Sequence, residues 1–404
     1  MLKAAVEENL ERERPIPLMG MSDRVQLEPV SRRLPPSEAG WQRILFCIVL
    51  IGVTLLAYFS PYYDWDLVAY IGSTIALHQQ DSRAIQAQAY AALQRELPQD
   101  DYTDIVRGSD FRRDVAQNAD HFRQQLPFYQ IRPLYIWSIG ALHASGFGFV
   151  VSTRILSSAA ILAIGVLLFF WMRRYATATL AAIATLLLLI TPVIFTSART
   201  GSPDALSALI VLIGAFEIVE RDRLAYGAMF LLVSLLLRTD NAIFVVLLFL
   251  SSALASTTSK TRTFQIILCV LAIATVLTVN RTQHSYSWSA LLRNTESPVV
   301  NPAEAPATIA SGDYFNDVRD MIDEARENSV TVFPFIALLS LISSRTPARL
   351  KRLVKVVLLS WAARIVLFPH IEDRYFITGA AIIGMAGVAA VLSRNETENL
   401  RVAA

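Results

Sequence analysis

The sequence predicts an all-α protein, a polytopic transmembrane helix bundle of about ten spans. Hydrophobic residues make up 54% of the 404 residues and charged residues only 17%, with a mean hydropathy of +0.43. Soluble domains contain about 25% charged residues, so this composition is typical of a membrane protein. The third observation is a series of long apolar segments separated by charged turns. Because the net charge is only +2, we expect no nucleic-acid partner.

The first 40 residues differ from the rest of the chain. They contain six basic residues, seven acidic residues and five prolines, a composition typical of a solvated, disordered tail. The tail is too long and too charged for the n-region of a cleaved signal peptide, so the first apolar span is expected to be a retained anchor. We therefore expect a tail over 1–40, a transmembrane domain over 41–394 and a second tail over 395–404.

Ten apolar segments follow the tail. They run over 42–60, 149–172, 178–198, 204–220, 224–237, 241–256, 264–280, 329–344, 353–368 and 375–392. A helix needs about 20 residues to cross about 30 Å of hydrocarbon, so several of them are short. As one helix, 224–256 would measure about 50 Å, and it is expected to break at Arg238–Asn241, with the turn below the outer surface. Cys47 and Cys269 both lie in apolar segments, which makes a structural disulfide unexpected.

The topology depends on the segment 131–146. If it lies in the interface, four basic clusters share the side of the N-terminal tail. If it crosses, all four lie outside, against the positive-inside rule. The clusters are Arg173-Arg174, Arg221/Arg223, Lys260/Arg262 and Arg345/Arg349/Lys351/Arg352. We therefore expect both termini in the cytoplasm, with a bacterial inner (plasma) membrane as the location.

This topology leaves two long outer loops, 61–148 and 281–328. The first loop carries amphipathic stretches, such as Ile85, Ala89, Leu93 and Leu97 at a spacing of four. This periodicity predicts interfacial helices lying along the membrane surface.

Asp64 and Asp66 follow the first apolar span directly. Ionisable side chains at a membrane are costly and usually functional. One interpretation is a short interfacial helix with Asp66 as its N-cap. Its buried face would then hold Leu67, Tyr70 or Ile71, Thr74 or Ile75, and His78. The alternative is ordinary capping next to a belt of aromatic residues.

Arginines also lie on the predicted outer side, each within a few residues of a carboxylate. They occur in Arg199–Asp204, Arg238–Asp240 and His370–Tyr375, and Arg132 lies in the first long loop. The planar guanidinium can donate two parallel hydrogen bonds to a phosphate, so the pattern predicts a polar site at the outer rim. Arg364 either serves the same rim or extends its charged end to the interface.

Each of these groups also has a structural interpretation. Asp204 follows Pro203 at the start of a span and is a candidate N-cap. The Arg238/Asp240 pair could instead satisfy the polar groups of the turn that is expected to lie below the outer membrane surface. The charges of His370–Arg374 are candidates for a solvated loop.

Together these residues resemble the GT-C superfamily of polytopic glycosyltransferases, which use lipid-phosphate-linked sugars on the extracytoplasmic face. The resemblance covers about 42–392 and rests on loose motifs. They are Asp66 with Tyr70, Arg132-Pro133, Arg199 with Pro203-Asp204, Arg238 with Asp240, and Arg374-Tyr375. The chain departs from the commonest pattern at Leu67, where many members carry an acidic residue.

The resemblance implies inverting transfer of one sugar from a polyprenyl-phosphate donor to a hydroxyl of a glycan, lipid or protein acceptor, within membrane lipid. Asp66 would be the general base, and Asp64 would orient the acceptor or tune Asp66. The phosphate would be held by Arg132, Arg199, Arg238 and Arg374, with Tyr70, Asp204, Asp240 and His370 as further substrate-binding residues. A divalent metal stays open, with Asp204, Glu372 and His370 as candidate ligands.

Other functions stay open at this point. A polysaccharide polymerase or ligase also uses arginines in outer loops. A transporter or flippase of lipid-linked sugars would place its ionisable groups near the bilayer midplane, in broken helices of two symmetric halves. A non-catalytic scaffold is the third alternative. Glu217 is the only acidic residue inside an apolar segment, so the charge distribution favours the transferase.

Overall fold

A computed structural model describes residues 36–296, 298–304 and 311–393. By its internal contacts the chain separates into Met1–Arg43 and Ile44–Ala404, and the description below concerns the second unit. Regular secondary structure in the described residues is entirely helical, and their β pairing is limited to an isolated bridge between Tyr62 and Thr200. The all-α prediction is therefore confirmed. The tail predictions for 1–35 and 395–404 lie outside the described residues, whereas 36–40 already belong to a helix.

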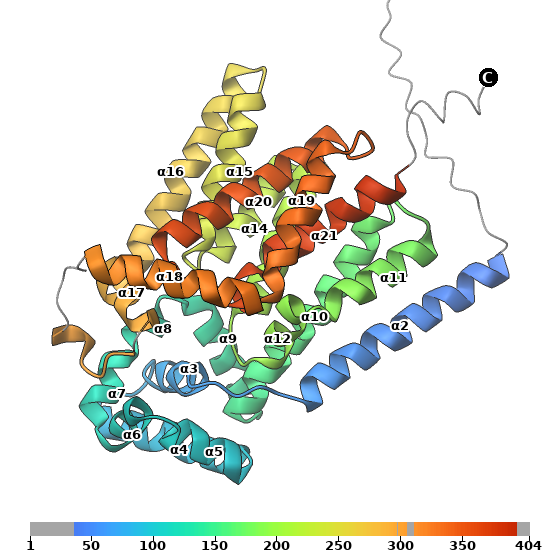
Figure 1. The fold of residues 1–404 in the computed structure, drawn as a ribbon. Helices are drawn as coiled ribbons and strands as arrows, with labels where there is room; N and C mark the ends of the chain where they lie inside the picture. The colour runs from blue at the N-terminus through green and yellow to red at the C-terminus, as the bar shows by residue number, and fades with distance from the viewer. Residues whose placement is uncertain (1–35, 297, 305–310, 394–404) are drawn as a thin grey trace, which may run out of the picture. The chain divides into compact units, whose positions relative to one another are not determined.

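The helices follow one another along the chain as drawn in Figure 1. They are α2 (Pro36–Phe59), α3 (Asp66–Ile75), α4 (Ser82–Glu96), α5 (Gln99–Arg107), α6 (Asp110–Gln117), α7 (Ala119–Gln125), α8 (Pro127–Gln130), α9 (Pro133–Ala144), α10 (Phe149–Met172), α11 (Ala178–Leu189), α12 (Pro192–Arg199), α13 (Asp204–Val219), α14 (Leu224–Ser234), α15 (Asn241–Ala255), α16 (Ser259–Thr282), α17 (Trp288–Glu296), η1 (Pro302–Glu304), α18 (Ser311–Glu327), η2 (Ser329–Val332), α19 (Phe333–Ile342), α20 (Ala348–Leu367), η3 (Asp373–Phe376) and α21 (Ile377–Leu392).

All ten apolar segments are helical, and four helices are long and apolar enough to cross a membrane. These are Gly40–Phe59, Phe149–Met172, Ser259–Thr282 and Asp373–Leu392. Two bent pairs raise the number to six if each is one span: Ala178–Leu189 with Pro192–Arg199 (65°), and Gly312–Glu327 with Ser329–Ile342 (76°). The described residues are thus compatible with a membrane protein of four to six candidate spans.

Helix length explains the difference from the ten predicted spans. α13 has 16 residues and α15 has 15, so each rises only about 22–24 Å at 1.5 Å per residue. α20 is 20 residues long but contains five basic side chains. The count of ten crossings therefore stays a prediction.

Two further expectations concern breaks and short helices. The stretch 224–256 breaks as predicted, although α14 already ends at Ser234 and α15 begins at Asn241. The segment that decides the topology forms α9, with 12 residues. At about 18 Å this helix is too short to cross the hydrocarbon on its own.

The second unit contains two hydrophobic cores. One lies among the long helices and includes residues of α10, α13, α15, α20 and α21. The other joins α3 to α4, α7, α8 and α9. Ile85, Ala89, Leu93 and Leu97 are all buried in this second core. The predicted helix is present, and its apolar face packs against protein.

The expected role of α3 is wrong in two respects. Asp66 is the first helical residue, the N-cap position is Trp65, and no side chain caps the helix. Leu67 to Ile75 are all buried, so the helix has no exposed face after Asp66. His78 lies beyond the end of α3 and is exposed. Because a charged group in a buried helix needs a partner, we expect the Asp66 carboxylate to bind a cation or a hydrogen-bond donor.

Candidate functional site

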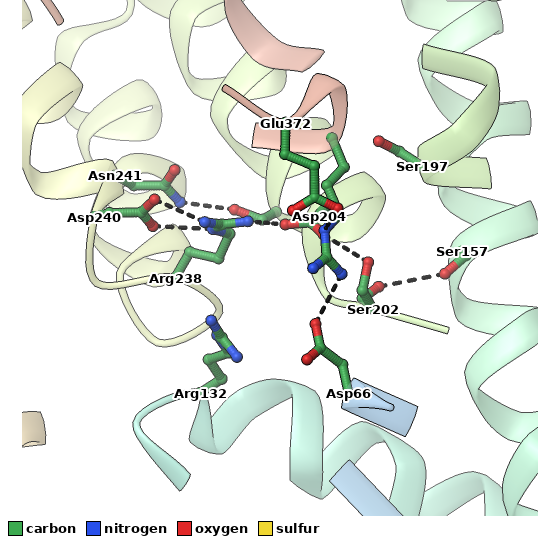
Figure 2. Close-up of polar contacts among 12 residues, drawn as sticks. Asp66, Arg132, Ser157, Ser197, Ser202, Asp204, Arg238, Asp240, Asn241 and Glu372 are labelled. Carbon is green, nitrogen blue, oxygen red and sulfur yellow. Dashed lines mark hydrogen bonds and ion pairs between the residues drawn. The ribbon is translucent and has the colours of Figure 1, made fainter. Parts of the chain in front are cut away.

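Two carboxylates from the first loop and one arginine from the far end of the chain meet at the centre of the site. Arg374 donates from Nη1 to Asp64 Oδ2 at 2.9 Å and to Asp66 Oδ2 at 2.8 Å. Its Nε lies 2.6 Å from Glu372 Oε1. The Arg374 side chain is only 11% exposed. Figure 2 shows Asp66 and Glu372 pointing toward each other from opposite sides.

Burial affects the two aspartates differently. Burial, followed by the charge of Asp66, raises the pKa of Asp64 to about 7 against the attraction of Arg374. Burial by itself would also raise the pKa of Asp66, but Arg374 and the Tyr129 hydroxyl hold it below its ordinary value. Asp66 is therefore ionised at neutral pH, and Asp64 carries a proton for part of the time. Neighbouring carboxyls with separated pKa values can serve as a base and an acid.

Asp66 is also held by an aromatic cluster. The Tyr129 hydroxyl donates to Asp66 Oδ1 at 2.7 Å. The Tyr70 ring lies edge-on to Tyr129, with centroids 5.1 Å apart, and the Tyr70 hydroxyl accepts a hydrogen bond from Arg132. The Arg132 guanidinium lies over both rings, at 5.4 and 5.6 Å from their centroids. Among the described residues, no carboxylate forms an ion pair with Arg132.

A second ionic network lies at the turn between α14 and α15. Arg238 donates from Nε and Nη2 to both oxygens of Asp240, at 2.9 and 2.8 Å, and its Nη1 pairs with Asp204. Asp240 also accepts from Arg364 Nη1 at 2.9 Å. Burial alone would raise the pKa of Asp240, but Arg238 and Arg364 lower it well below its usual range. The Asp240 carboxylate is thus held in its charged form.

Tyr375 joins the two networks. The guanidinium carbons of Arg364, Arg238 and Arg374 lie 4.3, 4.9 and 5.2 Å from the centre of its ring. Guanidinium groups pack well on aromatic faces. One ring therefore holds three arginines close together, even though like charges repel.

Main-chain contacts hold the segments that carry these side chains. Tyr62 N donates to the carbonyl of Arg199, which fixes the loop before Asp64 next to α12. Leu134 N donates to Leu236 O, which ties the start of α9 to the turn before Arg238. Figure 2 shows the result, with Arg132 pointing from the start of α9 toward Arg238.

Asp204 is positioned by a chain of serines. Ser157 Oγ donates to the carbonyls of Thr200 and Ser202, and Ser202 Oγ donates to Asp204 Oδ2 at 2.6 Å. Asp204 is the first residue of α13 and makes no capping hydrogen bond to it. The interpretation of Asp204 as an N-cap is therefore wrong, and its carboxylate serves Arg238 instead.

Two predicted site residues lie apart from these networks. Arg199 donates from Nε to Ser60 O at 2.5 Å and makes no ion pair with a described carboxylate. It therefore holds the end of α2 and does not join the arginines around Tyr375. His370 lies 3.2 Å from Glu324 of α18, and its ring is 6.4 Å from Tyr375.

The candidate metal ligands do not come together. Within the described ranges, no group of three histidine, cysteine or acidic residues is arranged to hold a metal ion. Asp204 pairs with Arg238, Glu372 with Arg374, and His370 with Glu324.

A small cavity of about 70 Å³ adjoins the second network, between α13, α15, α20 and α21. Its polar end is formed by Asp240, Asn241, Arg364 and Tyr375. Its other walls are mainly apolar, with Val211, Ile243, Phe244, Val357 and Trp361 among them. The cavity therefore joins a charged end to apolar walls, and its volume is well below the roughly 300–1,000 Å³ of a typical ligand pocket.

Tyr129 and Asn241 are members of the site that the sequence did not indicate. Tyr129 lies in a four-residue helix with no periodic pattern. Asn241 donates to Ser207 Oγ at 2.8 Å and to Ser234 O at 3.1 Å, and so closes the turn. The only sequence signal for Tyr129 is its position three residues before Arg132.

Comparison with protein-family models, with curated proteins and with solved structures found no match. The site itself defines what the chain can do. It holds an ionised buried carboxylate next to a second carboxyl of raised pKa, and four arginines within one region. Such a set can remove a proton and hold an anionic group.

Proposed function

We propose that this protein is an integral membrane glycosyltransferase. It moves a sugar from a polyprenyl-phosphate-linked donor to an acceptor hydroxyl on the extracytoplasmic face, and Asp66 is the general base. The observation that carries the proposal is the position of Asp66. Its carboxylate is ionised, largely buried and held between Arg374 and Tyr129.

The reaction follows from these groups. The acceptor oxygen attacks the anomeric carbon, and the bond from that carbon to the phosphate oxygen breaks. The electron pair of that bond leaves with the polyprenyl phosphate, and Asp66 takes the proton of the acceptor hydroxyl. Each carboxylate oxygen has two lone pairs, so Asp66 can accept this proton while Tyr129 and Arg374 stay in place.

Arg132 is the group best suited to receive the phosphate. The other arginines around Tyr375 already share carboxylates, whereas Arg132 has only the Tyr70 hydroxyl and two aromatic rings as described partners. A guanidinium without an anionic partner can bind an anion without first losing an ion pair.

The test is Asp66→Asn, assayed in membranes with a labelled polyprenyl-phosphate sugar. We expect kcat to fall by about 10²–10⁴-fold, the usual contribution of a general base. Glu220→Gln is the matched control, since Glu220 is a buried carboxylate distant from the site along α13, and it should keep wild-type kcat. Near-wild-type activity of Asp66→Asn would remove Asp66 from the role of base.

A further inference from the structure

The aromatic cluster around Asp66 contains three buried tyrosines whose hydroxyls make different hydrogen bonds. The hydroxyl of Tyr129 donates to Asp66, and the hydroxyl of Tyr70 accepts from Arg132. The hydroxyl of Tyr135 is buried without a hydrogen-bond partner in the described residues. Only one of the three therefore acts directly on the carboxylate.

The Tyr129 ring is held on several sides. The ring of Tyr70 meets it at 89°, and the ring of Trp65 lies 6.1 Å away at 63°. The Arg132 guanidinium lies over it at 5.6 Å. A ring fixed in this way keeps its hydroxyl in one place, so its hydrogen bond costs little further ordering.

The two oxygens of Asp66 depend on different partners. Oδ2 receives Arg374, which is shared with Asp64 and Glu372. Oδ1 receives Tyr129 and has no other described partner. Any anion that binds Arg374 will compete for the contact at Oδ2, whereas the contact at Oδ1 is independent of that arginine.

We infer that Tyr129 is a positioning residue for Asp66, which fixes the carboxylate through Oδ1 and keeps it oriented independently of the contact that Arg374 makes at Oδ2. This inference rests on the proposed function. Tyr129 stays a donor throughout, because burial and then the charge of Asp66 raise the pKa of its hydroxyl well above the ordinary value.

The experiment compares Tyr129→Phe with Tyr135→Phe, which removes a buried hydroxyl from the same cluster. A hydrogen bond to a charged group contributes about 1.5–3 kcal/mol, so kcat of Tyr129→Phe should fall about 10- to 100-fold. The KM for the labelled lipid-linked sugar should stay within about twofold. The acid limb of the pH profile should move to higher pH, because ionised Asp66 loses a donor. Tyr135→Phe should change none of these quantities.

Three results would overturn the inference. The first is a kcat of Tyr129→Phe within twofold of wild type. The second is an equal loss in Tyr135→Phe, which would indicate a packing effect. The third is an unmoved pH profile. If the wild-type protein transfers no sugar from any polyprenyl-phosphate donor, the proposed function fails, and the contact between Tyr129 and Asp66 is then judged from stability alone.

A double-mutant cycle separates the two failures. Thermal unfolding of Tyr129→Phe, Asp66→Asn and the double variant measures the coupling between the two side chains without an activity assay. Coupling in the absence of transfer would count against the proposed function alone, while leaving the contact in place. Additive effects would contradict the contact on which the inference rests.

Discussion

Buried ionic networks occur at both ends of α13, and they are built differently. Asp204 begins the helix and belongs to the network of Arg238. Glu220 directly follows the last residue of α13 and accepts from Trp171, Tyr175 and two arginines. The arginines there are Arg174 and Arg349.

The difference lies in the exposure of the arginines. The side chains of Arg174 and Arg349 are 41% and 47% exposed, while that of Glu220 is fully buried. In the Asp204 network, the side chains of Arg238 and Arg364 are only 10% and 13% exposed. A buried carboxylate paired with half-exposed cations stabilises the folded state, because the cations keep much of their contact with water. Burying both partners costs desolvation, which proteins usually accept at functional sites.

The largest effect is expected from removing the central arginine of the buried network. Arg238→Ala leaves Asp204 and one side of Asp240 without a cation, and the Asp204 side chain is 2% exposed. Breaking a buried pair from one side costs about 3–5 kcal/mol. The midpoint of thermal unfolding in detergent should therefore fall sharply.

The control adds Asp204→Asn to the Arg238→Ala variant. If an unpaired carboxylate causes the loss, removing its charge should recover part of the stability. A double variant that is less stable than Arg238→Ala would show that the loss comes from packing.

An intermediate effect is expected from pH. Burial raises the pKa of Asp64 from 3.8 to about 7, so between these values the folded state binds more protons than the unfolded state. Stability then falls as pH rises through this window. Asp64→Asn removes this loss. Between about pH 4 and pH 7 its unfolding midpoint should fall less than that of wild type, and parallel curves would contradict the raised pKa.

The smallest effect is expected at the other end of α13. Glu220→Gln keeps an oxygen that accepts from Trp171 and Tyr175, and the half-exposed arginines can return to water. We expect a loss of about 1 kcal/mol, measured by thermal unfolding. A loss as large as that of Arg238→Ala would remove the distinction between the two networks.

The helices and part of the site could be predicted from the sequence because both leave a local pattern in it. For the helices the pattern is a run of apolar residues, and for the site it is an arginine within a few residues of a carboxylate. Asp64, Asp66 and Arg374 could be assigned to one region because charge counting places them on one side, and the structure brings them into contact.

Other features depend on tertiary contacts that no local pattern reports. Asp66 and Asp204 both begin helices, so capping is the natural interpretation of the sequence, yet their oxygens bind arginines from other elements. Arg199 matches the motif, but its side chain donates to the backbone carbonyl of Ser60, directly after the end of α2. Helix length also depends on where tertiary contacts end a helix, so ten apolar segments do not by themselves establish ten crossings.

The contact between Asp66 and Arg374 has a consequence for biosynthesis. The two residues are 308 positions apart. At about 5–20 residues per second, the ribosome needs about 15–60 s to reach Arg374 after Asp66 has been made. During that interval the first loop carries a carboxylate whose arginine does not yet exist. Until Arg374 has been made, Tyr129 is the described side-chain partner that can hold Asp66, because it follows Asp66 by only 63 positions.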